Sequence, residues 1–430
     1  FNLIGSPAYS ITITTFHSYA FDVVGRLGSI DTTDDIIKEA TELIKNREVN
    51  PVKATKMVLV IDEAQDMNLD EYNLVEALME YNESLRVIAV GDDDQNIFEW
   101  RGSSSDYFRS IVEEEEAFYE LPVNFRSKSN LVDFSNQFVH TISKRLKKQT
   151  ISSYTKELGT IKITKYNTTD LIVPVVNDVI NANLKGSTCI ITRTNEQAIH
   201  IAGLLNLNGK KAQLIQTNDE FRLFNVFEIR QFIELLEKYD NPLITEGMWT
   251  EATEKLKTRF SNSKNFEMID LILNKFKTTA GNNPYLSDLI EFVYESNFSD
   301  FYIETPYTVS TFHKAKGKEF DNVFILYDNV NKSYTMKDEE KRKLYVGLTR
   351  AKTNISIHTS SPVFDKIKTN NQQNVVNDDL FEKPQQFIFH LTHRDIYLNY
   401  SKYVQNNIKD ATPGEELTIE DDILKYKNRK

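Results

Sequence analysis

The sequence predicts an α/β protein with two lobes, each built on a parallel β-sheet. Short apolar runs rich in Val, Ile and Leu recur without polar alternation, which is typical of parallel strands buried on both faces. Helix-like stretches separate these runs, and such alternation favours doubly wound sheets. The runs fall into two groups, before about residue 125 and after about residue 160, so we expect two lobes. The predicted strands are Met57–Ile61, Val87–Val90, Thr188–Thr192, Val323–Tyr327 and Ile355–His358.

Amphipathic segments between these runs predict helices. They are Glu71–Tyr81, Asn130–Leu146, Thr194–Asn206 and Asn225–Lys238. Residues 229–304 keep the helical pattern without a buried-strand run, so we expect a small helical insertion in the second lobe. The tail begins with a strand-like run, Gln386–His390, and continues with a helical pattern, Asp395–Tyr403.

These patterns divide the chain into four predicted parts. The first lobe covers residues 1–150 and carries a short insertion at about 19–56. The second lobe covers 151–228 and 305–385, around the helical insertion at 229–304, and a C-terminal extension covers 386–430.

The composition is that of an ordinary globular protein. The 430 residues exceed one ordinary hydrophobic core, and 40% of them are hydrophobic and 27% charged. No apolar run reaches the roughly 18 residues that cross a bilayer, so we expect no membrane partner. The net charge of −12 argues against a general nucleic-acid binder but allows a local basic groove. The single cysteine, Cys189, excludes an internal disulfide framework and suits a cytoplasmic location.

One apolar run ends directly in two acids, Asp62 and Glu63. In open α/β sheets ligands bind at the carboxyl ends of strands. An acid there can hold Mg²⁺ that bridges two phosphates, and its neighbour can deprotonate an attacking water. The pattern also fits a strand followed by a helix with an acidic first turn, which the helix dipole favours.

The next run, Val87–Val90, ends in Gly91 and three aspartates followed by Gln95. The neutral amide of Gln95 can contact both a phosphate oxygen and a water. Phe98 and Trp100 follow, and exposed aromatic rings beside a nucleotide site would suit stacking on unpaired bases. They could equally be ordinary core aromatics.

The order and spacing of these segments and several others resemble UvrD/Rep-type superfamily 1 helicases, over residues of about 12 to 358. The resemblance implies two RecA-like lobes, of which the first is incomplete. The matching segments are Thr15–Ser18, Asp62–Asp66, Gly91–Gly102, Asn124–Ser127, Ile190–Asn195, Val309–Asp321 and Leu344–Ala351.

The resemblance implies ATP and Mg²⁺ as cofactors. In the family, Asp62 would hold Mg²⁺, Glu63 would act as general base and Gln95 would sense the γ-phosphate. Arg126 and Arg350 would contact that phosphate from opposite sides of a cleft between the lobes. The nucleotide would also lie close to two residues of the segment Val309–Asp321, Gly317 and Glu319.

The resemblance further implies single-stranded DNA, or junctions of single- and double-stranded DNA, as partners. The positions that would contact DNA are His17, Phe98, Trp100, Thr311 and His313. Family polarity would be 3′ to 5′, with a role such as DNA repair. Because both insertions are short, we expect translocation more firmly than strand separation.

A phosphate-binding loop of the form Gly-x₄-Gly-Lys-Ser/Thr is missing from the sequence. The Gly-Lys pairs Gly209-Lys210 and Gly317-Lys318 lack both the upstream glycine and the following hydroxyl residue. In the family this loop precedes the segment that matches Thr15–Ser18, so we expect it in an N-terminal segment of the same protein. This chain alone should then hydrolyse ATP negligibly.

Two other functions remain open at this point. One is a non-catalytic DNA-binding or scaffolding module with a relict motor fold. The other is a nuclease–helicase fusion, although the C-terminal region carries no clustered acid and lysine signature of a metal nuclease, so a nuclease would lie outside this chain.

Overall fold

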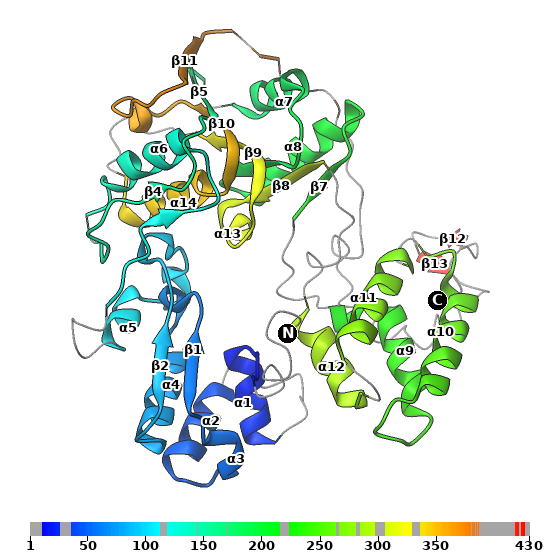
Figure 1. Cartoon of the computed structure of the whole chain (residues 1–430). Coiled ribbons are helices and arrows are strands. Elements are labelled where there is room, and N and C mark those ends of the chain that lie inside the picture. The colour runs from blue at the N-terminus through cyan, green and yellow to red at the C-terminus, as the bar shows by residue number, and fades with distance from the viewer. Residues whose placement is uncertain are drawn as a thin grey trace. The chain divides into compact units, whose positions relative to one another are not determined.

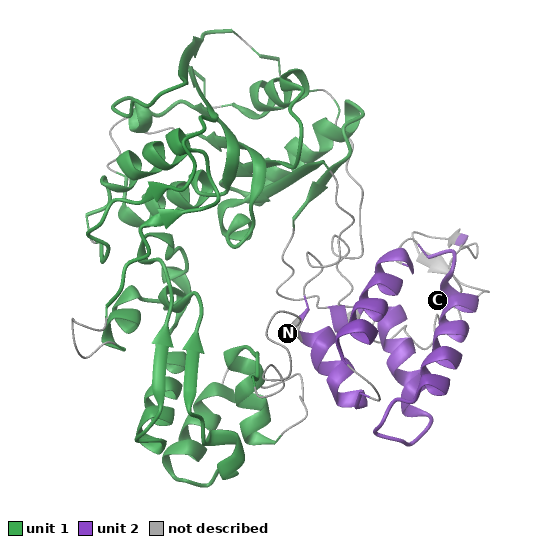
Figure 2. Ribbon diagram, in the orientation of Figure 1, with its two compact units in different colours: residues 1–215, 305–388 green, residues 216–304, 389–430 purple. Residues whose placement is uncertain are grey.

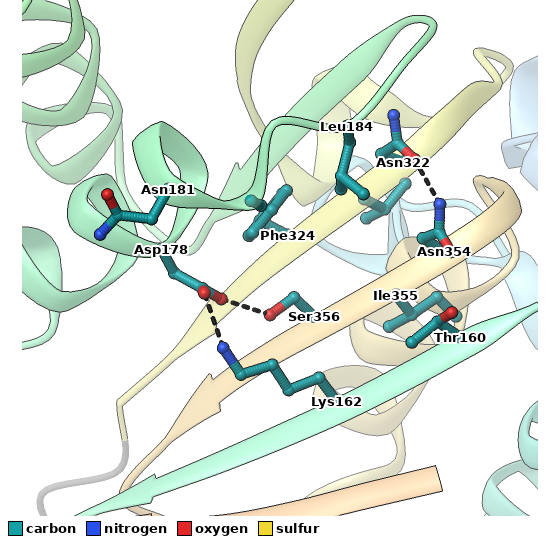
Figure 3. Close-up of a pocket in the computed structure, with 12 residues that line it drawn as sticks. Thr160, Lys162, Asp178, Asn181, Leu184, Asn322, Phe324, Asn354, Ile355 and Ser356 are labelled. Carbon is teal, nitrogen blue, oxygen red and sulfur yellow. Dashed lines mark hydrogen bonds and ion pairs between the residues drawn. The ribbon is translucent and has the colours of Figure 1, made fainter. Parts of the chain in front are cut away.

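The computed structural model describes ten segments of the chain and a few short pieces near its end. The segments are 11–25, 36–111, 118–143, 145–168, 170–215, 223–263, 266–280, 284–296, 306–328 and 336–379; the pieces are 381–382, 384, 386, 418–420 and 423–425. The chain divides into two compact units, Phe1–Ile215 with Thr305–Ile388 and Gln216–Glu304 with Phe389–Lys430 (Figure 2).

A seven-stranded parallel sheet dominates the first unit (Figure 1). The strand order is β11-β5-β10-β9-β6-β8-β7, and every pairing in it is parallel. The strands are β5 (Thr160–Tyr166), β6 (Thr188–Thr192), β7 (Ala212–Leu214), β8 (Tyr307–Thr311), β9 (Phe320–Tyr327), β10 (Ala351–Thr359) and β11 (Gln372–Asn377). The predicted α/β class and the predicted strands at β6, β9 and β10 are confirmed.

Four strands of this sheet escaped prediction for a common reason. β5 carries threonines and two lysines among its apolar residues, and β8 carries threonines and a serine. β7 has only three residues, and β11 is an edge strand with the sequence QQNVVN. None of them reads as a continuous apolar run. Continuous apolar runs therefore do not reveal strands that have a polar face or lie at an edge.

Helices cover both faces of this sheet. One core joins α6 (Ser129–Val139), α13 (Phe312–Ala315) and α14 (Asp338–Leu348) to the sheet, and the other joins α7 (Ile172–Ala182) and α8 (Asn195–Leu207) to it. Cys189, in β6, is fully buried, and burial raises the pKa of its thiol.

Helix α6 differs from the prediction in length and in place. Phe134 and Phe138 are fully buried, and their rings lie 5.9 and 5.5 Å from the Phe364 ring, measured between centroids. These aromatic rings bury against the seven-stranded sheet, so α6 belongs to its core although it precedes the predicted lobe boundary at residue 150. The helix also ends at Val139, short of the predicted Leu146, and Arg145 and Leu146 instead contact the loop after β2.

The N-terminal part of this unit holds a two-stranded parallel sheet. It consists of β1 (Val58–Ile61) and β2 (Arg86–Ala89), joined by α4 (Leu69–Tyr81), and both strands were predicted. Asn68 and Glu71 form a capping box that begins α4. Three more helices pack with α4 in one core: α1 (Phe16–Val24), α2 (Ile36–Lys45) and α3 (Pro51–Ala54).

One face of this small sheet is open. Val58 and Val60 are 51% and 61% exposed, and Ile88, opposite Val60 on the neighbouring strand, is 52% exposed. Parallel sheets are ordinarily covered on both faces, so this exposure is unusual. Further along, short elements follow: η2 (Ala64–Asp66), η3 (Asp93–Gln95), η4 (Glu99–Arg101), α5 (Ser105–Ser110) and the parallel pair β3 (Val123–Asn124) and β4 (Ser152–Ser153).

The second unit is largely helical. Its helices are α9 (Phe227–Glu237), α10 (Glu246–Phe260), α11 (Phe266–Thr279) and α12 (Leu286–Glu295), packed around aromatic residues such as Phe232 and Trp249, whose rings meet edge to face at 5.0 Å. Near the end of the chain, β12 (Thr418–Glu420) pairs antiparallel with β13 (Ile423–Lys425). The predicted strand Gln386–His390, apart from Gln386, and the predicted helix Asp395–Tyr403 lie outside the described residues. No helix in the described segments is long and apolar enough to cross a membrane.

Candidate nucleotide and nucleic-acid site

The two acids predicted for catalysis lie at the carboxyl end of β1. Asp62 and Glu63 follow the strand directly, and both are exposed. Glu63 has φ 52° and ψ 38°, a left-handed conformation that costs a non-glycine residue about 1–2 kcal/mol. Immediately after this turn, Ala64 N donates to Val90 O at 2.9 Å. The acids therefore lie beside the loop that follows β2.

A buried amide network joins the ends of the two strands. Gln65, fully buried, donates from Nε2 to Glu63 Oε2 at 2.5 Å and accepts from Asp92 N at 2.8 Å. Asp92 Oδ2 accepts from Gln95 Nε2 at 2.7 Å. A Cβ at Gly91 would collide with the Gln65 amide, so this approach requires glycine. The same network thus holds the predicted base, Glu63, and the predicted sensor, Gln95.

Arg350 is a buried cation, 3% exposed, that contacts neutral oxygens. It donates to the carbonyls of Val346 and Lys318 at 2.9 and 3.3 Å. Its Nη2 donates to Thr349 Oγ1 at 2.9 Å and to Gln95 Oε1 at 2.7 Å. Among the described residues no carboxylate accepts a hydrogen bond from it. A buried guanidinium without a carboxylate partner is suited to an anionic ligand.

Arg126 lies close enough to Arg350 to act on it electrostatically. Burial and then the like charge of Arg126 lower the pKa of Arg350 to about 10. Arg126 donates to Glu319 Oε2 at 2.8 Å and to Thr349 O at 3.2 Å, and Lys352 Nζ lies 2.6 Å from Glu319 Oε1. We expected the two arginines on opposite sides of a cleft. Their contacts instead place both with the seven-stranded sheet, because Glu319 directly precedes β9 and Arg350 directly precedes β10.

Lys316, which sequence reasoning did not single out, connects several site residues. Its Nζ donates to both carboxylate oxygens of Asp66, at 2.5 and 2.7 Å, and to Gln95 O at 2.8 Å. It also lies 3.8 Å from Glu63 Oε2 and 5.2 Å from the centroid of the Phe98 ring. The signal was its place in Val309–Asp321, the segment that already supplied Thr311 and Glu319.

Of the residues predicted to contact DNA, the structure brings Phe98 and His313 together, with ring centroids 5.9 Å apart. Burial lowers the pKa of His313, and its Nε2 is buried without a hydrogen-bond partner in the described part of the chain. Trp100 is 66% exposed, whereas Thr311, at the start of α13, is only 6% exposed. His17 lies on the exposed side of α1.

Gly317, the other residue predicted near the nucleotide, has φ 75°. That left-handed turn follows α13, and a Cβ there would meet no atom within 4 Å. The position therefore requires glycine for its backbone conformation and not for space. Glu319 follows two residues later.

An exposed aromatic pair beside Arg126 also escaped prediction. Phe125 and Tyr154 are 75% and 73% exposed, and their ring centroids lie 4.9 Å apart. Phe125 directly precedes Arg126, so its place in Asn-Phe-Arg-Ser was the available signal. The two ring planes are tilted by 33°, so the pair forms an exposed apolar surface beside Arg126.

Comparison with known proteins identifies two family matches along most of the chain. The family model described as the UvrD/REP helicase N-terminal domain matches residues 26–116. The model described as the UvrD-like helicase C-terminal domain matches residues 119–304 and 253–361. The second match alone covers more than half of the chain.

Individual relatives are more distant. Gabija protein GajB of Bacillus cereus is 22% identical over 70% of this chain and 63% of its own length. ATP-dependent DNA helicase Rep of Buchnera aphidicola subsp. Schizaphis graminum is 23% identical over 90% of this chain and 73% of its own length. ATP-dependent DNA helicase Rep of Escherichia coli is 33% identical over 26% of this chain and 18% of its own length. The chain thus spans under two thirds of GajB and a small part of the last relative.

Proposed function

Because the chain belongs to the UvrD/Rep helicase family, we propose that it forms the motor of an ATP-dependent DNA helicase or translocase. The motor would move along single-stranded DNA, 3′ to 5′, and act in the cytoplasm. The observation that carries this proposal is Arg350, a buried cation bonded to neutral oxygens and to the amide of Gln95. Such a group is ready to receive an anion at the place where the predicted sensor lies.

The residues present fit ATP with Mg²⁺. Asp62 is exposed and accepts a hydrogen bond from its neighbour's backbone, Glu63 N, through Oδ1 alone, which leaves carboxylate oxygen for a metal. Bound ATP would supply the phosphoanhydride bond whose hydrolysis drives the motor. Glu63 would accept the proton of the attacking water, and Gln95 and Arg350 would contact the terminal phosphate.

Lys316 supports coupling between the proposed nucleotide site and the proposed DNA-binding residues. Its ammonium bonds Asp66 and the Gln95 carbonyl and lies over the Phe98 ring. Phe98 in turn contacts His313. A change in contacts near Gln95 would therefore reach the two rings that we propose stack on DNA bases, because one buried cation touches both groups.

We propose DNA stacking on Phe98, His313 and Trp100. Neutral imidazole and aromatic faces stack on any base without sequence preference. Burial keeps His313 neutral near pH 7, since its pKa lies below the ordinary value, and the exposed ring of Trp100 needs no rearrangement to meet a base.

We further propose that additional polypeptide of the same protein covers the open face of β1 and β2. Val58, Val60 and Ile88 support this, because an isolated two-stranded parallel sheet with an exposed apolar face is marginal in water. A strand and helix placed there would carry the phosphate-binding loop. The present chain alone should then bind ATP weakly and hydrolyse it negligibly.

The test is DNA-stimulated ATPase of a longer gene product that contains the loop. Arg350→Ala and Arg126→Ala should each lower the rate on the order of 10³-fold or more, as loss of an arginine finger does. Arg109→Ala, on the exposed side of α5, is the matched control and should leave the rate unchanged. A longer protein without DNA-stimulated ATPase would favour the relict scaffold, and full activity of the present chain alone would overturn the proposal for the open face.

A further inference from the structure

Three consecutive aspartates, Asp92, Asp93 and Asp94, bring their carboxylates within 4.8 Å of one another after β2. Asp93 and Asp94 are almost fully buried, at 4% and 0% exposure. Asp92 is half-buried, and three carboxylates at this spacing repel one another unless cations neutralise them. The structure supplies those cations from a segment more than 50 residues further along the chain, Arg145–Lys147.

The two cations contact Asp92 and Asp94. Arg145 contacts Asp94 through Nε and Nη2, at 3.0 and 2.8 Å, in a two-point arrangement that fixes the carboxylate plane. Lys147 Nζ lies 2.5 Å from Asp92 Oδ1 and 3.1 Å from Asp94 Oδ2. The backbone of the same segment holds Asp93, because Leu146 N donates to Asp93 Oδ2 at 2.6 Å. Protein groups therefore occupy the cluster where a metal ion could otherwise bind.

The contact between Asp92 and Gln95 gives this cluster a functional consequence. The Gln95 amide lies between Asp92, whose ionised carboxylate can only accept, and Arg350, whose guanidinium can only donate. Its nitrogen must therefore face Asp92, and its oxygen must face Arg350. The orientation is unique only as long as the Asp92 carboxylate stays in place.

We propose that Lys147 is a positioning residue that fixes the orientation of Gln95 through Asp92. It acts on both ends of the Gln95–Arg350 contact. Its ammonium bonds Asp92 and also lies 5.7 Å from the centroid of the Tyr345 ring, on the helix α14 that leads to Arg350. What this orientation serves, sensing of the γ-phosphate, rests on the proposed function.

The charge of Lys147 is secure in this environment. Burial acts to lower its pKa, but the negative charges of Asp92 and Asp94 outweigh burial, so the pKa of Lys147 rises above its usual value. Without this ammonium, Asp92 would face the neighbouring carboxylates unneutralised. Burial and then the charge of Asp94 raise the pKa of Asp93, as expected where further negative charge is unfavourable.

The test observes the Gln95 side-chain amide directly and needs no nucleotide. In protein labelled with ¹⁵N-glutamine, the Gln95 resonance is assigned by its loss in Gln95→Asn, and the exchange of its Nε2 protons with water is measured. Lys147→Met should accelerate that exchange on the order of tenfold, the effect of losing a hydrogen bond to a charged group. Lys147→Arg, which keeps the charge, should restore protection.

Two further variants make the outcome decisive. Lys148→Met removes the neighbouring lysine, whose exposed side chain lies outside the cluster, and should leave exchange unchanged. Asp92→Asn keeps the shape but removes the charge, and it should accelerate exchange even if Lys147→Met fails to fold. Unchanged Gln95 exchange in the folded variants overturns the proposal. Absence of DNA-stimulated ATPase in a protein that also carries the phosphate-binding loop would contradict the proposed function, but it would leave the role of Lys147 in orienting Gln95 unaffected.

Discussion

At the residue scale, the sequence indicates candidate functional side chains more readily than it indicates the contacts between them. Glu63 and Gln95 are linked through Gln65 and Asp92, since parallel strands bring their carboxyl ends to one edge. Arg350 joins them through its hydrogen bond to Gln95. The hydrogen bonds of Arg126 to Glu319 could not be anticipated, because 193 residues separate the two along the chain. Roles proposed for these residues stay predictions.

Lys316 provides a residue-scale prediction about stability. Lys316→Met should lower the free energy of unfolding by about 2–4 kcal/mol, because it leaves the half-buried Asp66 carboxylate without its cation. Burial already raises the pKa of Asp66, so an unpaired charge there is costly. Urea unfolding at pH 7 measures the change. The double variant Lys316→Met with Asp66→Leu should recover most of the loss, and a single variant as stable as the parent would contradict the prediction.

Trp100 provides a second residue-scale prediction. Trp100→Ala should weaken binding of single-stranded DNA about tenfold, because stacking of a base contributes roughly 1–3 kcal/mol. Stability should change little, since the ring is 66% exposed. Fluorescence anisotropy with a labelled oligonucleotide measures the affinity. Val376→Ala, an exposed apolar residue on the edge strand β11, is the control, and equal affinity of the Trp100 variant and the parent would count against the stacking site.

At the scale of elements, helices α6 and α4 show where sequence patterns succeed and where they do not. The capping box of Asn68 and Glu71 and the apolar periodicity of α4 are local, so the helix lies close to its predicted range. The end of α6 is not local. Arg145 and Leu146 leave the helical pattern because Asp93 and Asp94 bind them, and no periodicity within the segment reveals that contact.

The position of α6 can be tested by hydrogen exchange. Phe138→Ala should cost about 3–5 kcal/mol, because the ring is fully buried against Phe364 and the seven-stranded sheet. Protection should fall in β5 and β10 and persist in β1 and β2. Phe108→Ala, in the small core with Ile61, should give the opposite pattern. If the Phe138 variant instead lost hydrogen-exchange protection first in β1 and β2, α6 would belong to the core of the first lobe.

At the scale of the whole molecule, buried parallel strands were predictable and strands with polar faces were not. Continuous apolar runs located β6, β9 and β10, while the threonines of β5 and β8 concealed the strands that lie second from each edge of the same sheet. The net charge of −12 gave no indication of the cation clusters at the site, because these are local and compensated by neighbouring acids.

The open face of the small sheet leads to a prediction about association. The present chain should self-associate at micromolar concentration through Val60 and Ile88, since exposed apolar strands pair with other copies. Val60→Glu with Ile88→Lys, which face each other across the strand pair, should keep it monomeric in analytical ultracentrifugation. Val52→Lys, 80% exposed on α3, should not. A monomeric parent chain would argue against an adhesive face.

The burial of Cys189 has a practical consequence for following this protein in solution. Its thiol is fully enclosed in β6, and burial raises its pKa, so little reactive thiolate forms near neutral pH. No other cysteine is present in the sequence. Maleimide dyes should therefore attach only at cysteines introduced by design, without first replacing the native one. Pairs of dyes on α3 and β11 could then report energy transfer, molecule by molecule, as nucleotide and DNA are added.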